Sequence, residues 1–398
     1  MIKMANTKLL GFPNDSMKSY FRSSRDEFLG EFNPMFEGHR RFDEVGFLNW
    51  RDDEDVDYHG ISSKAIISDS KRVSDLYSRL CSGEISFDSP DGSFRDLLED
   101  HAEEIGESVN EFNPSLMRAF NTHFATELGL VARSYSGAPL MVSAHDPTRL
   151  TPALSEVDAL VCESHELRRL CIENFSVDPG RISVIHNGID MDYFYPNSDS
   201  EISDVVPKEF LDAKYKVFSS SRLVRGKNIE VLLRAISTVR GELPGLIHLH
   251  LGDDGGQPSK AAEIYRAQEE LGLKNTSYFL GSKSKSELPA YYSWADVFVL
   301  PTLWEGLSRV MRESLACGTP VIATDYGSSS EIVRSGYNGV SIDPNSVDEI
   351  ADSMVRVLKD NKLRKGLEKN ARGSVAKYSS EKSMKSYSAL YDKLLTAG

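Results

Sequence analysis

The 398-residue chain has few cysteines, a deficit of basic residues and no long apolar run, and each shortage excludes a class of protein. Its four cysteines, Cys81, Cys162, Cys171 and Cys317, show no C-x-x-C spacing, which argues against a disulfide framework and predicts buried thiols in a reducing compartment. No uninterrupted apolar stretch reaches the ~18 residues of a membrane-spanning helix, and no signal-peptide pattern opens the chain. We therefore expect a cytoplasmic protein and leave peripheral membrane contact open.

Acidic residues dominate the charge. The 60 aspartates and glutamates outnumber the 46 lysines and arginines, which gives a formal net charge of −14. A nucleic-acid partner would need a basic surface, so the composition argues against one. A small anionic ligand stays compatible with this charge, because local cations in a cleft override the global sign.

The length suits two domains, and the clearest pattern is an alternation of short apolar runs with amphipathic stretches. Buried parallel strands appear in sequence as short apolar runs, and the helices that connect them appear as amphipathic stretches. The alternation predicts a doubly wound α/β architecture. The runs that predict strands are 138–146, 158–164, 181–190, 215–223, 246–254, 276–281, 296–302 and 320–327.

One polar segment interrupts this series. Residues 193–215 carry two prolines and several serines without an apolar period, and we interpret them as a linker. The predicted domains are then 1–195 and 205–375. Residues 376–398 are predicted to be helical, because their apolar residues fall on one stripe. Residues 20–110 show no comparably clear pattern.

Two cations follow the predicted strand 215–223. Arg222 and Lys227 lie just before a helical stretch, and ligands bind at the carboxyl ends of strands in open α/β sheets. Two cations before a helix N-terminus suit a diphosphate, although solvated loop cations would read the same way. The segment LGDDGG (251–256) ends the next strand in a tight loop that lets backbone approach a ligand.

Two glutamates, Glu305 and Glu313, follow the strand 296–302 with seven residues between them. Glu305 lies in a loop, and Glu313 lies inside a predicted helix that Gly318 ends. Carboxylates accept hydroxyl hydrogens in fixed geometry, so this pair suits a molecule with a sugar, a diphosphate and a ribose in a row. Two surface acids on an ordinary helix are the alternative. Three backbone amides are expected to point into the same space: Gly306, Leu307 and Ser308.

Six ordered blocks resemble the retaining glycosyltransferases of family 4, which have the GT-B fold. They include VIHNGIDMDYFYP (184–196), RLVRGKN (222–228), LGDDGG and the long run from Phe279 to Pro344. The spacing of the two glutamates matches the E-x7-E motif of that family. The resemblance covers about residues 115 to 398. It implies two Rossmann-like domains facing one another across a cleft, with the donor held mainly by the second and the last helix crossing back to the first.

The resemblance also implies roles for the charged residues. It places Arg222 and Lys227 at the donor diphosphate, where they offset the charge of the leaving group. Glu313 falls where the family holds the nucleotide ribose. Glu305 falls beside the transferred sugar, as a hydroxyl ligand or as a nucleophile.

Backbone and histidine positions carry over as well. Gly281 and Ser282 are expected to face the nucleobase. His145, at the end of a predicted strand, falls where the family often has a histidine near the donor sugar and the acceptor. Asp146 either orients this ring or begins the loop, and His123 is a weaker candidate for the same role.

The implied reaction moves a sugar from a nucleoside-diphosphate sugar to a hydroxyl acceptor with retention. We expect a UDP- or GDP-sugar as donor and a sugar, lipid-linked or polysaccharide acceptor, in glycan, polysaccharide or glycolipid biosynthesis. We expect no cofactor and no metal, because fixed cations replace it and no D-x-D follows a strand. The family's glycine-rich first loop has only Gly11 here, which leaves the acceptor class open. Arg312 stands at a commonly apolar position, and we expect it to face solvent.

Other functions on the same scaffold stay open. An epimerase or a phosphorylase would share the cleft, although no cofactor lysine or phosphate pocket for a phosphorylase is identifiable. An inactive nucleotide-sugar-binding protein is a third alternative. The joint presence of Arg222, Lys227, Glu305 and Glu313 argues against it, because a binding relic would be free to lose any of them.

Overall fold

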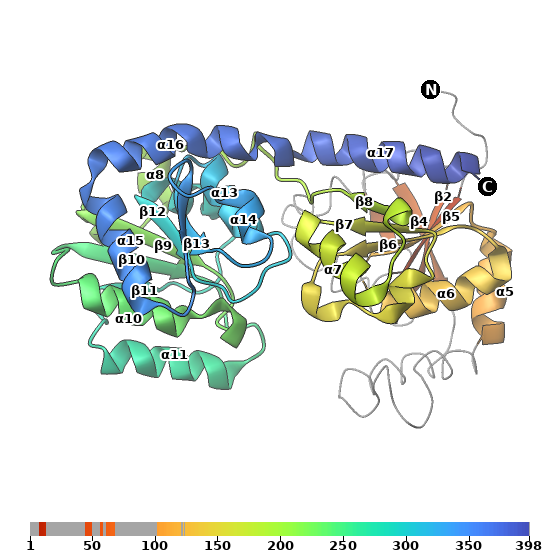
Figure 1. The fold of residues 1–398 in the computed structure, drawn as a ribbon, viewed down its shortest axis with the longest axis horizontal. Coiled ribbons are helices and arrows are strands. Elements are labelled where there is room, and N and C mark those ends of the chain that lie inside the picture. The colour runs from red at the N-terminus through yellow and green to blue at the C-terminus, as the bar shows by residue number, and fades with distance from the viewer. Residues whose placement is uncertain are drawn as a thin grey trace. The chain divides into compact units, whose positions relative to one another are not determined.

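The structure is a computed structural model of the chain. It describes residues 8–12, 44–49, 56–58, 61–67, 102–120, 122 and 124–397. His123 and the loop after β1 therefore lie outside the described residues. The chain divides into two compact units, of which the first is Met1–Gly188 with Glu381–Gly398 and the second is Ile189–Ser380. Each unit is built around a sheet with helices on its faces (Figure 1).

The second unit contains a six-stranded parallel sheet in the order β11-β10-β9-β12-β13-β14. The chain starts in the middle of this sheet, at β9, moves outward through β10 and β11, and then returns to the other side of β9 for β12. The order thus reverses between β9 and β12, which is where α/β sheets bind ligands. The strands are β9 (Tyr215–Ser220), β10 (Leu246–Leu251), β11 (Ser277–Phe279), β12 (Val297–Leu300), β13 (Val321–Thr324) and β14 (Gly339–Ile342).

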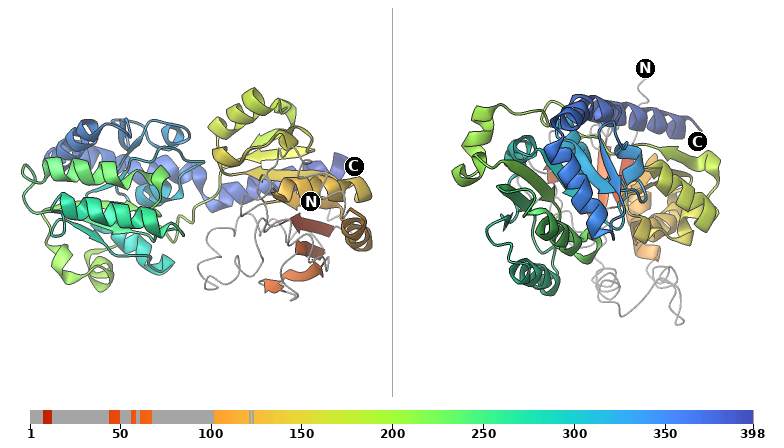
Figure 2. Two further views of the ribbon diagram at one scale, coloured as in Figure 1. Left: turned by 90° about the horizontal axis from the view of Figure 1, so that it is seen from below. Right: turned by 60° about the vertical axis from the view of Figure 1, so that its left-hand side comes forward.

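Helices cover both faces of this sheet (Figure 1, Figure 2). One face packs Leu232, Ile264 and Met354 of three helices against the strands. These helices are α10 (Ile229–Val239), α11 (Pro258–Glu270) and α15 (Val347–Lys359). The opposite face packs Tyr292 and Met311, among others. Its helices include α12 (Leu288–Trp294), α13 (Arg309–Ala316) and α16 (Asn361–Val375).

The segment 193–215, which we predict as a linker, instead forms two helices of the second unit. These are α8 (Asp199–Val205) and α9 (Lys208–Leu211). Val206 and Phe210 are buried in the core of that unit. Two isolated apolar anchors leave no periodic signal, so a prediction from periodicity does not detect them.

The first unit contains an eight-stranded sheet in the order β3-β4-β2-β1-β5-β6-β7-β8, parallel except for the pair β3 and β4. The strands are β1 (Lys8–Phe12), β2 (Glu44–Asn49), β3 (Val56–Tyr58), β4 (Ile61–Ile67), β5 (Leu116–Ala119), β6 (Leu140–Ala144), β7 (Ala159–Cys162) and β8 (Ile182–Val184). All eight runs predicted as strands contain one, so the doubly wound α/β prediction is confirmed.

Helices flank this sheet on both sides. One side carries α5 (Ala102–Phe112), α6 (Phe124–Ser136) and α7 (His165–Phe175). The other side is covered by α17 (Ser380–Ala397), whose Tyr387 and Tyr391 pack against the strands (Figure 1). The last helix thus belongs to the first unit. Within the described ranges, no helix is long and apolar enough to cross a bilayer.

Candidate functional site

An ion pair joins the two strand ends at the point where the strand order of the second sheet reverses. The ammonium of Lys227, in the turn after β9, donates to Oε1 of Glu305, in the loop after β12. The two side chains are only 20% and 13% exposed. Because β9 and β12 are hydrogen-bonded neighbours, residues 78 positions apart in sequence meet at one edge of the sheet. The structure thus brings together two residues that the sequence predicts to share a site.

Short contacts hold these two loops against each other. The carbonyl of Gly226 accepts hydrogen bonds from the backbone of Leu303 at 2.8 Å and from the hydroxyl of Thr302 at 3.1 Å. A Cβ atom at position 226 would lie 2.6 Å from the ring of Trp304, so any larger residue there would have to displace this indole. The positions of Lys227 and Glu305 are therefore fixed by backbone contacts as well as by their own charges.

Glu313 lies inside α13 with its carboxylate buried. The hydroxyl of Tyr292 donates to its Oε2 at 2.8 Å, and Nε of Arg309 lies 3.1 Å from its Oε1. Burial and, after it, the Glu313 charge raise the pKa of Tyr292 well above the ordinary value, so the phenol stays a proton donor. Each carboxylate oxygen thus has one partner within the unit and retains accepting capacity for a second.

The start of α13 presents unused donors. Ser308 precedes the helix and is 3% exposed, yet its Oγ has no hydrogen-bond partner within the described chain. The amides of Gly306, Leu307 and Ser308 belong to the same turn. A helix start carries partial positive charge and orphan N–H groups, which attract an anion.

Arg312 does not face solvent, and the expectation that it does is wrong. Its side chain is buried with the residue 1% exposed, and it donates to the carbonyls of Ser308 at 3.2 Å and of Leu307 at 3.0 Å. Its guanidinium also lies over the ring of Tyr378, 5.6 Å from the centroid. These bonds occupy the carbonyls of the turn before α13, and so hold that turn in one conformation.

Arg222 lies at the same edge of the sheet but makes no ion pair with any described residue. Its aliphatic stem rests against Gly255, where an added Cβ would lie 2.9 Å from Cδ of the arginine. The backbone of Leu223 donates to the carbonyl of Asp253 at 2.7 Å. The glycine-rich loop after β10 therefore supports the stem of Arg222 and leaves its guanidinium exposed.

The loop after β11 is tied to the same glycine-rich loop. The backbone of Gly252 donates to the carbonyl of Gly281 at 3.0 Å, and the hydroxyl of Ser282 donates to Oδ2 of Asp253 at 3.0 Å. Gly281 has a φ of 70°, and a Cβ added there would meet no atom within 4 Å. The backbone at 281–282 is thus accessible at the carboxyl edge.

His145 lies in the first unit, at the end of β6. Its Nδ1 is 2.5 Å from Oε1 of Glu163, and its Nε2 is 3.0 Å from the carbonyl oxygen of Phe120. Both ring nitrogens therefore face acceptors supplied by neighbouring strand ends. Asp146 accepts from the backbone of Thr148 at 2.9 Å, so it begins the next loop and does not orient the ring.

Three residues of the site were missed in the sequence: Tyr292, Arg309 and Glu163. Their partners lie between 4 and 21 positions away, on other elements or one helical turn on. Arg309 and Glu313 stand at i and i+4 of a predicted helix, and this spacing was the one usable signal. Within the described residues there is no group of three or more histidines, cysteines or acids that could hold a metal ion.

Two family models match consecutive parts of the chain. "Glycosyltransferase Family 4" matches residues 94–193, and "Glycosyl transferases group 1" matches residues 203–374. The chain belongs to the family-4 type of glycosyltransferase. The resemblance to this family that the sequence blocks indicate is thereby confirmed, while the assignment of the E-x7-E motif stays a prediction.

Curated relatives of this glycosyltransferase are similar over part of their length. A D-inositol 3-phosphate glycosyltransferase of Corynebacterium jeikeium is 28% identical over 62% of this chain and 59% of its own. The UDP-Gal:alpha-D-GlcNAc-diphosphoundecaprenol alpha-1,3-galactosyltransferase of Escherichia coli is 29% identical over 54% of this chain and 55% of its own. The chain thus spans less than two thirds of the length of either relative.

Solved structures are similar over nearly the whole chain. Anabaena HepE, solved in complex with UDP and glucose, has a TM-score of 0.73 at 20% identity, covering 98% of this chain and 100% of that one. Sucrose-phosphate synthase of Thermosynechococcus elongatus has a TM-score of 0.74 at 21% identity, with the same coverage. At this identity the likeness concerns the fold, and it confirms the GT-B fold for this chain.

Proposed function

We propose that this glycosyltransferase moves a sugar from a nucleoside-diphosphate sugar to a hydroxyl acceptor, with retention and without a metal ion. The observation that carries the proposal is the Lys227–Glu305 ion pair at the strand-order reversal of the second sheet. HepE was solved with UDP-glucose, which favours a UDP-sugar over a GDP-sugar as the donor. The second unit is the donor-binding domain in this proposal, and the first unit binds the acceptor.

Lys227 is the main contact for the donor diphosphate. An ammonium has three donors, so the bond to Glu305 leaves two for phosphate oxygens. Among the described residues, Arg222 has no carboxylate partner and Ser308 Oγ has no hydrogen-bond partner, so both are available to the same anion. The start of α13 adds the amides of Gly306 and Leu307. These fixed cations and dipoles take the place of a metal ion in stabilising the leaving group.

Two carboxylates hold the sugars on either side of this anion. Glu313 accepts the ribose hydroxyls on the oxygen positions that Tyr292 and Arg309 leave unused. Glu305 accepts a hydroxyl of the transferred sugar. The backbone at Gly281 and Ser282 faces the nucleobase.

The reaction forms the bond from the acceptor oxygen to the anomeric carbon and breaks the bond from that carbon to the phosphate oxygen. The phosphate leaves on the face where the acceptor arrives, and one of its oxygens takes the acceptor proton. Positive charge develops on the sugar ring and negative charge on the phosphate, where Lys227 and Arg222 stabilise it. His145, held by Glu163 and Phe120, is assigned to the acceptor side of the reaction.

The acceptor is a sugar, a lipid-linked sugar or a polysaccharide in glycan biosynthesis. The Escherichia coli relative acts, by its name, on a diphosphoundecaprenol-linked sugar, which supports a lipid-linked acceptor and peripheral contact with a membrane. Cys162, Cys171 and Cys317 are buried free thiols, which suits a cytoplasmic location.

A panel of UDP-, GDP- and ADP-sugars, incubated with the protein in the presence of EDTA, tests this proposal. We expect release of one nucleoside diphosphate, faster when an acceptor is added. Glu305→Gln should lower transfer while nucleoside diphosphate binding persists. Thermal stabilisation by a nucleotide sugar without turnover would favour the inactive binding protein, and loss of activity in EDTA would overturn metal independence.

A further inference from the structure

Two buried histidines on β10 form a continuous hydrogen-bonded chain with serines of both neighbouring strands. Nδ1 of His248 lies 2.7 Å from Oγ of Ser277 on β11, and its Nε2 lies 2.8 Å from Oγ of Ser219 on β9. The same Ser219 oxygen is 2.7 Å from Nδ1 of His250. Nε2 of His250 is 3.0 Å from the carbonyl oxygen of Ser221, where this series of hydrogen bonds ends.

The last acceptor of this series fixes which atom donates in each of its hydrogen bonds. The carbonyl of Ser221 only accepts, so Nε2 of His250 donates to it. Burial holds the pKa of His250 down to about 4, so its ring is neutral and its Nδ1 accepts from Ser219. Ser219 then accepts from Nε2 of His248, which accepts in turn from Ser277. One arrangement of protons satisfies both imidazoles completely.

These imidazoles stand where apolar side chains would ordinarily pack. His248 and His250 share a face of β10 with Leu246, and that face packs against α10 and α11 through apolar residues. Both histidines are fully buried, with 0% exposure. A buried polar network in an apolar layer is costly unless it is fully satisfied, and a satisfied one specifies a single geometry.

The geometry specified here is that of the peptide before Arg222. The ladder between β9 and β10 runs as far as the bond from Ser221 N to the carbonyl of Leu251, at 3.0 Å. Beyond it, a Cβ at Gly252 would lie 1.9 Å from the oxygen of Ser221, so the backbone of this glycine passes close to that carbonyl. His250 takes up this carbonyl oxygen directly after the last bond of the ladder.

We propose that His250 is a positioning residue for Arg222, and that His248 and Ser219 hold His250 in the required tautomer. The hydrogen bond to Ser221 fixes the peptide plane from which the Arg222 side chain starts, and thereby aims the guanidinium at the donor diphosphate. This inference rests on the proposed function for the role of Arg222, but the peptide geometry stands independently of it.

Two amide variants of the same residue separate this role from simple packing. The side-chain nitrogen of glutamine reaches the place of Nε2, so His250→Gln keeps the donor to Ser221. His250→Asn is also a neutral amide but is one methylene too short to reach that carbonyl. Leu249→Ala, on the opposite face of β10, is the control for loss of stability without contact to Ser221.

Titration calorimetry with UDP and with uridine reads out the effect on the diphosphate. We expect His250→Asn to weaken UDP binding about tenfold, the effect of one buried hydrogen bond, with uridine binding unchanged. His250→Gln should bind UDP within about threefold of the unaltered protein. Equal weakening of UDP and uridine, an effect of the same size in Leu249→Ala, or no difference between the two amide variants would overturn the inference.

A second readout needs no ligand. The Nε–H resonance of Arg222 in the NMR spectrum should shift in His250→Asn and stay in place in His250→Gln. If the unaltered protein binds neither UDP nor uridine, the proposed function fails, and this resonance then decides the positioning role alone. An unmoved Arg222 resonance in both variants would overturn it.

Discussion

The hydroxyl of Tyr292 donates a 2.8 Å hydrogen bond to Oε2 of Glu313, although the two residues belong to different helices. Both side chains are buried, and Arg309 holds the other carboxylate oxygen. The carboxylate is therefore oriented before any ligand arrives, and the hydroxyl stays protonated because burial raises its pKa.

Tyr292→Phe removes this bond and little volume. We expect the free energy of unfolding to fall by about 1–2 kcal/mol, since a buried carboxylate loses one donor. KM for the donor should rise several-fold with a smaller change in kcat, because Glu313 is assigned to the ribose rather than to the reacting bond. Urea unfolding and initial rates check this, and an unchanged KM would count against the ribose assignment.

Arg312 gives a second prediction. Arg312→Leu leaves the carbonyls of Leu307 and Ser308 without their charged donor, and we expect a loss of stability of about 2 kcal/mol. Diphosphate binding should weaken because the turn before α13 loses its fixed conformation. Arg312→Lys cannot reach two carbonyls in the same fork geometry and should recover little. Thermal unfolding and UDP binding of both variants test this, and normal UDP affinity in Arg312→Leu would contradict it.

The buried histidines predict how stability depends on pH. In the unfolded chain a histidine binds a proton near pH 6.5, whereas burial holds the pKa of His250 at about 4 in the fold. Between these values the unfolded chain binds more protons, so the free energy of unfolding falls as pH drops from 6.5 to 4. The loss from His250 amounts to roughly 3 kcal/mol at most. Burial also lowers the pKa of His248, and this adds to the loss of stability.

Urea unfolding at pH 7, 5.5 and 4.5 measures this slope. Glutamine at position 250 does not titrate in this window, so the stability of His250→Gln should fall less steeply over the same range, and His248 accounts for part of the slope that remains. An equal slope in that variant would show that other groups cause the pH dependence.

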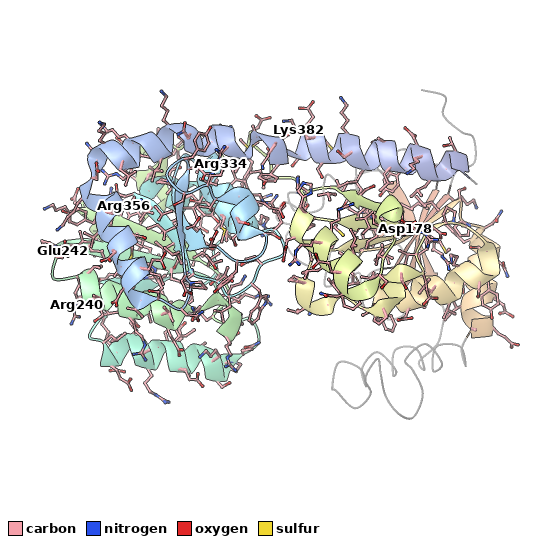
Figure 3. All side chains as sticks on the ribbon, in the orientation of Figure 1. Asp178, Arg240, Glu242, Arg334, Arg356 and Lys382 are labelled. Carbon is pink, nitrogen blue, oxygen red and sulfur yellow. The ribbon has the colours of Figure 1, made fainter. Side chains whose placement is uncertain are left out.

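The docking of α17 gives a further prediction. Arg118, fully buried on β5, donates to the hydroxyl of Tyr391, and its guanidinium lies 4.6 Å from the ring centroid of Tyr387. Tyr391→Phe removes a partner of a buried cation, at a cost of about 2 kcal/mol. Limited proteolysis should then cut within α17 earlier than in the unaltered protein. Lys382→Ala, exposed on the same helix (Figure 3), is the control and should leave the cleavage rate unchanged.

The sequence carries most of the architecture in local patterns. The strands read as short apolar runs because they are buried on both faces, and the meeting of Lys227 with Glu305 follows from the rule that parallel strands end at one edge. The two helices in 193–215 could not be predicted from the sequence, because Val206 and Phe210 anchor them without a periodic apolar pattern. Their burial is a property of the neighbours, which no local pattern records.

The site residues divide in the same way. Arg222 lies in a loop after a strand and Glu313 lies inside the helix that follows another strand, where local sequence predicts them. A charged side chain is seldom fully buried, so the sequence predicts Arg312 at the surface. Only the folded turn supplies the two carbonyls whose hydrogen bonds compensate for the burial of its charge. The imidazole chain on β10 was likewise not predictable, since its serines come from strands 29 residues away in either direction.

The central claim is that the loops after β9 and β12 bind a nucleoside diphosphate through Lys227. Calorimetric titration of UDP, GDP and ADP into the unaltered protein, Lys227→Ala and Arg356→Ala measures this directly. Arg356 is an exposed cation on α15 (Figure 3), close to the end of the helix and so at the opposite edge of the sheet. The account predicts that one nucleotide binds, that Lys227→Ala weakens it by about 10²-fold or more, and that Arg356→Ala leaves it unchanged. Absence of binding by the unaltered protein, or equal affinity in the Lys227→Ala variant with its fold intact, would contradict the account.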